Sequence, residues 1–271
     1  MFIPFKPIQL PRMHPILFDV GGVTVYSYGA MIALGSIFGV AYMAVRGKKE
    51  VGLTFDQANA LFICIFVAAF VGGKVFLFFE DASYYLKYPM KLVTGRGFVF
   101  YGSFLFTIPA MLWFFKKQKL DTYKMLDVMA ITTCLVHIFG RLGCFLAGCC
   151  HGRPTDSVIG ITFTDAACYA DPLNMPLFPT QLMEAGYILV IMIILLFLRE
   201  RRKFYGQLFL LYIMFYAVGR SILEIYRGDS ARGFIIKNYL SHSQLIAIIL
   251  FGTGVYVYIM LVKKNKAARI K

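Results

Sequence analysis

Seven long apolar runs dominate the pattern of hydrophobic and polar positions. Each approaches the roughly twenty residues that an α-helix needs to cross a hydrocarbon core about 30 Å thick. The pattern therefore predicts an all-α, polytopic membrane protein with about seven transmembrane helices. The expected helices cover residues 25–45, 57–79, 98–115, 125–146, 181–198, 206–225 and 243–262. The fourth run is the least sharply bounded, because it contains Asp127, His137 and Arg141.

Composition agrees with a membrane protein. Hydrophobic residues make up 59% of the chain and charged residues 15%, with a mean hydropathy of +0.69. A soluble domain carries about 25% charged residues. We expect residues 1–271 to form a single integral-membrane domain, in which 147–180 is an extracytoplasmic loop. Residues 1–24 contain several prolines and no apolar core of a cleavable signal peptide, so we expect an uncleaved interfacial segment.

Basic residues indicate the orientation of the helices, because Lys and Arg accumulate in cytoplasmic loops. Alternate loops form two sets, one with more basic residues than the other. The set with more basic residues should be cytoplasmic, so the N-terminus should be outside and the C-terminus cytoplasmic. The richer set contains Arg46, Lys48, Lys49, Lys116, Lys117, Lys119, Lys124, Arg199, Arg201, Arg202, Lys203, Lys263, Lys264, Lys266, Arg269 and Lys271. The poorer set contains Lys6, Arg12, Lys87, Lys91, Arg96, Arg153, Arg227, Arg232 and Lys237. The net charge of +14 is mostly this topology signal, and it gives no reason to expect a nucleic-acid partner.

Polar residues gather at the helix ends that this topology turns outward. We therefore expect one polar cavity in the outer half of the membrane. The residues concerned are Tyr28, Tyr101, Arg141, Gln181, Glu184, Arg220, Glu224, Ser243 and Gln244.

Two arginines stand out among them. An arginine at the centre of a membrane helix costs about 2.5–3.5 kcal/mol on insertion scales, so Arg141 is a functional candidate. It has no acidic residue within a helical turn, which leaves its charge available for an anion. Arg220 lies four residues before Glu224 and seven before Arg227, so Glu224 can pair with either arginine. Two guanidinium groups near a membrane surface favour a phospholipid headgroup.

Several segments resemble the prolipoprotein diacylglyceryl transferase family, in an order that extends over nearly the whole chain. Tyr28-Gly29 resembles the start of the family's first helix, and GRLGCFLAGCCHGRPT (140–155) its arginine-glycine signature. FPTQLMEAG (178–186) resembles a Pro-Ser-Gln-Leu-Tyr-Glu segment, and YAVGRSILEIYRGD (216–229) supplies the second arginine.

This resemblance implies an enzyme of the bacterial inner membrane with its active site toward the outer leaflet. It would transfer the diacylglyceryl group of phosphatidylglycerol to the lipobox cysteine of a prolipoprotein, forming a thioether and releasing glycerol phosphate. Arg141 would hold the headgroup, Arg220 would stabilise the leaving phosphate, and Gly152 would shape the pocket. The catalytic candidates are Arg141, Arg220, Tyr101 and Tyr28. The candidates for substrate binding are Arg141, Gly152, Gln181, Glu184, Glu224 and Arg227.

The chain departs from the family at two positions. Tyr101 stands where the family has a motif histidine, and Cys144 replaces the usual asparagine. A phenol with a pKa of about 10 is a poor base at neutral pH. Either the field of the two arginines lowers the pKa of the acceptor thiol, or Tyr101 orients a group, or the chain has another role. His151 is a further candidate base, ahead of His137.

The six cysteines do not show the spacing of a standard zinc site. We therefore expect no metal and no organic cofactor. Cys149, Cys150 and Cys168 should lie outside, where a disulfide from Cys168 to the signature loop is possible.

Other classes of membrane protein fit less well. A transporter of an anionic solute would show repeated halves, and a retinal-type receptor a lysine within residues 243–262; the sequence has neither. A non-catalytic phospholipid-binding paralogue remains the main alternative.

Overall fold

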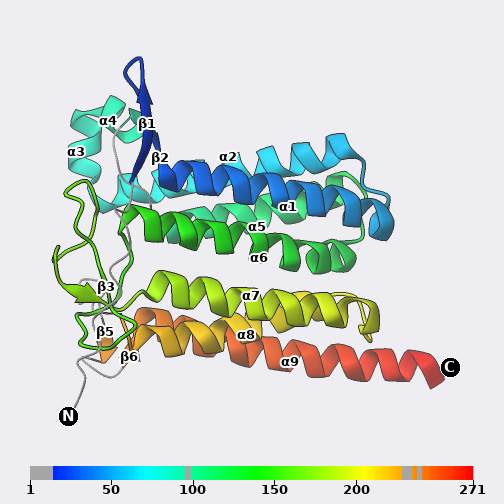
Figure 1. The fold of residues 1–271 in the computed structure, drawn as a ribbon. Helices are drawn as coiled ribbons and strands as arrows, with labels where there is room; N and C mark the ends of the chain where they lie inside the picture. The colour runs from blue at the N-terminus through cyan, green and yellow to red at the C-terminus, as the bar shows by residue number, and fades with distance from the viewer. Residues whose placement is uncertain (1–14, 95–98, 228–233, 237–239, 271) are drawn as a thin grey trace, which may run out of the picture. The chain divides into compact units, whose positions relative to one another are not determined.

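The computed structural model describes residues 15–94, 99–227, 234–236 and 240–270, which are mainly helical (Figure 1). They divide into two compact units. The first contains the described residues up to Gly39 and those from Met129 onward, and the second contains Val40–Val128. Helices α1 (Ser27–Val51) and α6 (Thr122–Ala147) each contribute to both.

Six helices among the described residues are long and apolar enough to cross a membrane. They confirm a multi-pass membrane architecture, and the uncertain fourth run is one continuous helix, α6. The six are α1, α2 (Phe55–Glu80), α6, α7 (Thr180–Leu198, extended by the 3-10 turn Arg199–Arg201), α8 (Gln207–Glu224) and α9 (His242–Ile270).

The remaining predicted run, 98–115, corresponds to helix α5 (Phe100–Lys117). This helix contains Pro109 and ends in Lys116 and Lys117, which lowers its apolar character. It packs along α2 within the second unit. A Cβ atom added at Gly102 would lie 2.7 Å from Phe76 Cβ, so the glycine permits close helix contact. A total of seven spans stays a prediction.

The second unit also contains two short helices after α2, α3 (Ala82–Lys87) and α4 (Pro89–Thr94). An apolar groove of about 280 Å³ lies between α2 and α4. None of the candidate site residues lines this groove.

Three two-stranded antiparallel ribbons show that the all-α expectation was too simple. They are β1 (Ile16–Val20) with β2 (Val23–Tyr26), β3 (Ile161–Thr162) with β4 (Pro176–Leu177), and β5 (Phe234–Ile236) with β6 (Leu240–Ser241). Gly21 and Gly22 turn the first ribbon with positive φ angles of 61° and 81°. Residues 16–24 of the expected interfacial segment thus form a hairpin, and residues 1–14 lie outside the described part of the chain.

The helices of the first unit pack through specific side chains. The Tyr187 hydroxyl of α7 donates a hydrogen bond to the Phe215 carbonyl of α8 at 2.6 Å. Gln207 Nε2 of α8 donates to the Tyr258 hydroxyl of α9 at 3.1 Å. These contacts hold α7, α8 and α9 beside one another (Figure 1).

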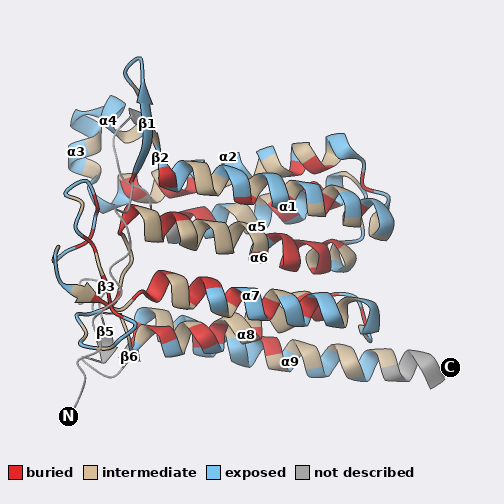
Figure 2. Ribbon diagram, viewed as in Figure 1, coloured by how far each residue is buried: buried red, intermediate tan, exposed pale blue. Residues whose placement is uncertain are grey.

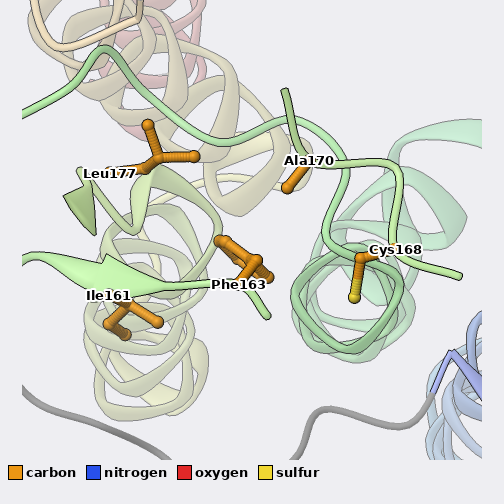
Figure 3. Packing of buried hydrophobic residues seen from close by; sticks show 5 residues of the cluster. All are labelled: Ile161, Phe163, Cys168, Ala170 and Leu177. Atoms are coloured by element: carbon orange, nitrogen blue, oxygen red, sulfur yellow. The ribbon is translucent and has the colours of Figure 1, made fainter. Parts of the chain in front are cut away.

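The expected loop 147–180 is an ordered part of the first unit. It has a small core of Ile161, Phe163, Cys168, Ala170 and Leu177 (Figure 3). Phe145 of α6 and Leu182 of α7 pack against this core. Burial continues into the first two turns of α7, where polar Gln181 and Glu184 are almost fully enclosed (Figure 2).

Candidate functional site

Glu184 is the centre of the polar cluster in the first unit. Arg141 Nη2 lies 3.0 Å from Glu184 Oε1, and His137 Nε2 lies 3.4 Å from the same oxygen. The Tyr216 hydroxyl donates to that oxygen at 3.1 Å. Three helices, α6, α7 and α8, therefore converge on one carboxylate that is only 1% exposed.

The ion pair with Glu184 corrects the expectation that the charge of Arg141 has no acidic partner. No acid lies near it along α6, but Glu184 reaches it from α7. A buried charge is costly unless it is paired and hydrogen-bonded, so each group stabilises the other in its charged form. Arginine has five N–H donors, and the carboxylate oxygen engages one edge of the guanidinium.

Arg220 and Glu224 form the i,i+4 pair that the spacing predicts, with 2.7 Å between Nη1 and Oε2. Ser241, the last residue of β6, and Ser243, in the first turn of α9, are near enough to Glu224 to interact with it. Arg220 is also near enough to Glu184 for electrostatic interaction. The predicted gathering of Arg141, Glu184, Arg220 and Glu224 is therefore present within one unit.

The signature loop after α6 is fixed by the first turn of α7. Gln181 Nε2 donates to the Cys149 carbonyl at 2.7 Å, and the Thr180 hydroxyl donates to the Cys150 carbonyl at 2.8 Å. Gly148 and Cys150 have positive φ angles of 74° and 62°. Gln181 was a predicted site residue, and its contact here is with the loop backbone.

Gly152 lies where three chain segments meet. Its amide donates to the Phe178 carbonyl at 2.8 Å, and the next amide, that of Arg153, donates to the Tyr226 carbonyl at 3.0 Å. A Cβ atom at Gly152 would lie 2.7 Å from Phe178 Cβ and 2.9 Å from Thr180 Cγ2. Glycine is thus required by close packing around the loop.

The two ring nitrogens of His151 are both engaged. Nδ1 lies 2.9 Å from the Gly152 carbonyl oxygen, and Nε2 accepts from the Asp171 amide at 3.3 Å. This pattern selects the neutral ring with its proton on Nδ1. To act as a base, His151 would have to release the Asp171 amide.

The two candidate tyrosines belong to different units. Tyr28, near the start of α1, packs on α6, where a Cβ atom at Gly143 would lie 3.2 Å from Tyr28 Cα. Tyr101 lies in the first turn of α5 in the second unit, with 51% of its surface exposed. The catalytic roles of both tyrosines stay predictions.

Three cysteine side chains gather at the signature loop. The Sγ atoms of Cys144, Cys149 and Cys150 all lie within 4.8 Å of one another. Hydrogen bonds from Cys144 and Cys149, together with the charges of Arg227 and Arg141, lower the pKa of the Cys150 thiol. Burial and Asp165 raise the pKa of Cys168. All six cysteines are free thiols, so the disulfide that the sequence left open is not formed in this structure.

Sequence reasoning missed Tyr216 and Thr180. Tyr216 lies four residues before Arg220, on the same helical face, and that spacing was the available signal. Thr180 precedes Gln181 at the start of α7, but its hydrogen bond to the distant Cys150 carbonyl has no sequence signal.

Comparison with known proteins identifies the family of this chain. The sequence profile of the family described as "Prolipoprotein diacylglyceryl transferase" matches residues 15–260. A phosphatidylglycerol–prolipoprotein diacylglyceryl transferase of Clostridium tetani is 36% identical, over 91% of this chain and 97% of its own length. A second such transferase of Clostridium perfringens is 31% identical, over 91% and 94%. That of Geobacter sulfurreducens is 29% identical, over 95% and 99%. The chain therefore belongs to the prolipoprotein diacylglyceryl transferase family.

Proposed function

We propose that this chain transfers the diacylglyceryl group of phosphatidylglycerol to the lipobox cysteine thiol of prolipoproteins. A carbon–sulfur bond forms as the bond between the glyceryl carbon and the phosphate oxygen breaks. Glycerol phosphate leaves, and the proton of the thiol leaves with it in the overall balance. The reaction would be the first step of bacterial lipoprotein maturation.

The buried cluster around Glu184 is the observation that carries this proposal. Negative charge builds on the phosphate as the bond to carbon breaks, and preorganised cations stabilise such charge. Glu184 Oε1 lies 3.0 Å from Arg141 Nη2, and this contact orients the guanidinium. Other N–H groups of the guanidinium would then donate hydrogen bonds to the lipid headgroup. Glu224 orients Arg220 in the same way.

The acceptor thiol needs activation, because a free cysteine is only a few per cent thiolate at neutral pH. The positive field of Arg141 and Arg220 would favour the thiolate. Tyr28, Gln181, Gly152 and Arg227 would shape the site around it. Tyr101 would orient a substrate group rather than accept a proton.

The setting we propose is the bacterial inner membrane, with seven spans in a single domain. The N-terminus would be outside, the C-terminus cytoplasmic, and the active site open to the outer leaflet. The exposed apolar side chains of the β1 strand, such as Phe18 and Val20, support a place for this hairpin at the membrane surface.

A product analysis tests the proposed function. Purified protein is incubated with phosphatidylglycerol and a peptide carrying a lipobox cysteine, and both products are measured by mass spectrometry. We expect the peptide mass to rise by one diacylglyceryl group and an equal amount of glycerol phosphate to appear. A peptide with serine in place of that cysteine should stay unmodified. Binding of the lipid without either product would instead indicate a phospholipid-binding protein.

A further inference from the structure

The three thiols at the signature loop have the geometry of a metal-binding group. In a tetrahedral zinc site the Zn–S bonds are about 2.3 Å, which places the sulfur atoms roughly 3.8 Å apart. The Sγ atoms of Cys144, Cys149 and Cys150 lie within 4.8 Å of one another. Small side-chain adjustments would therefore bring all three into ligand positions around one ion.

The backbone that supports these thiols is already fixed. Cys149 N donates to the Cys144 carbonyl at 3.1 Å, which closes the loop at the end of α6. Cys150 has a positive φ of 62°, and its Sγ lies within 4.8 Å of those of Cys144 and Cys149. The carbonyls of Cys149 and Cys150 are anchored by Gln181 and Thr180. Such supporting contacts orient ligands and raise metal affinity.

The charges around the cluster fit an anionic metal–thiolate group. Three thiolates with one divalent ion carry a net charge of −1, and the guanidinium groups of Arg141 and Arg227 are near enough to Cys150 to interact with it. Soft thiolate ligands select thiophilic ions such as Zn²⁺ over Mg²⁺ or Ca²⁺. The decisive feature is the approach of three sulfur atoms to one another.

We propose that Cys144, Cys149 and Cys150 bind one thiophilic metal ion, with Zn²⁺ as the representative, and leave its fourth coordination position open for the acceptor thiol. Zinc sites that take part in reactions have three protein ligands and one open position. Cys149 and Cys150 are only partly buried, which allows access to that position.

This site would supply a means of deprotonating the acceptor thiol, which Tyr101, a poor base at neutral pH, does not. A thiol that coordinates zinc is deprotonated, so the metal performs the task for which the chain offers no evident base. Binding of M²⁺ to three protein thiols and one acceptor thiol releases up to four protons to solvent and forms four metal–sulfur bonds, with no change of oxidation state. The inference rests on the proposed function for the identity of the acceptor thiol, and it departs from the sequence-based expectation of no metal.

The first test measures metal binding without any transfer reaction. Detergent-solubilised protein is reduced, treated with a chelator, exchanged into buffer and titrated with Co²⁺, a spectroscopic substitute for Zn²⁺. We expect one Co²⁺ per chain and a thiolate-to-metal charge-transfer band. Cys149→Ser should weaken the binding by at least about tenfold. Cys64→Ser and Cys168→Ser, which change thiols outside the cluster, should keep both the stoichiometry and the band.

A second test examines the open position. A lipobox peptide with a free cysteine should alter the Co²⁺ spectrum, and the same peptide with serine should not. No charge-transfer band in the reduced wild-type protein, or equal binding by a Cys144→Ser/Cys149→Ser/Cys150→Ser variant, would overturn the metal site. An equal response to both peptides would overturn the acceptor role. Neither readout requires transfer, so a failure of the proposed function would be seen separately, as metal binding without product.

Discussion

Arg141 and Glu184 reach each other from two different helices, with 3.0 Å between Nη2 and Oε1 and both side chains largely buried. The pair links the signature end of α6 to the first turns of α7. The Tyr216 hydroxyl extends the link to α8. The position of the Arg141 guanidinium is therefore determined by contacts between helices rather than by its own helix.

Glu184→Gln should destabilise the protein. Breaking a buried ion pair by removing one partner costs about 3–5 kcal/mol, because an uncompensated charge stays buried. We expect a clear fall in the melting temperature of the detergent-solubilised protein, together with a loss of transferase activity. Thermal unfolding measured at constant lipid and detergent concentration checks the first effect.

A matched control for that variant is Glu200→Gln. Glu200 pairs with Arg199 at 3.2 Å, but 66% of its side chain is exposed. Exposed pairs contribute about 0–1 kcal/mol. Equal melting temperatures for Glu184→Gln and Glu200→Gln would contradict the structural importance of the buried pair.

Gly152→Ala should impair folding of the signature loop. The added methyl group would press on Phe178 and Thr180, and such overpacking costs about 1–3 kcal/mol. Gly186→Ala is the matched comparison, because a Cβ atom at Gly186 meets no atom within 4 Å. Thermal unfolding of both variants checks the difference, and a Gly152→Ala protein as stable as Gly186→Ala would show that the loop has room.

Cys150 should react faster than Cys168 with an alkylating reagent in metal-free protein at neutral pH. The lowered pKa of Cys150 increases the fraction of reactive thiolate, whereas the raised pKa of Cys168 decreases it. We expect Cys150 to react roughly tenfold faster or more than Cys168. Time-resolved peptide mapping measures both rates, and faster labelling of Cys168 would contradict this ordering of the pKa values.

Much of the architecture could be predicted from local sequence patterns. The positions of the long helices could be predicted from apolar runs of membrane-spanning length, because length and hydropathy are properties of a continuous segment. The Arg220–Glu224 pair followed from i,i+4 spacing on one helix. The family could be predicted from sequence motifs and from the order in which they occur along the chain.

Contacts between segments could not be predicted in the same way. Glu184 is far from Arg141 in sequence, so only the packing of α7 on α6 reveals their pairing. The three thiols meet at a turn in which Gly148 and Cys150 adopt positive φ angles, and the spacing of the cysteines along the chain does not reveal that turn. The hydrogen bond from the Asp171 amide to His151 likewise depends on the path of the loop.

The central claim is that Arg141 binds the lipid headgroup and that Arg220 stabilises the leaving phosphate during transfer. Its most direct test is the initial rate of thioether formation from phosphatidylglycerol and a lipobox peptide, compared among Arg141→Ala, Arg220→Ala and Arg46→Ala. Arg46 pairs with Glu50 at 2.8 Å in the same i,i+4 geometry as Arg220 with Glu224, but no candidate site residue lies beside it along α1. We predict a rate loss of about 100-fold or more for the first two variants, similar to the loss of a charge-stabilising donor in other enzymes, and a near-normal rate for Arg46→Ala. Near-normal rates for Arg141→Ala and Arg220→Ala in folded protein would contradict the account.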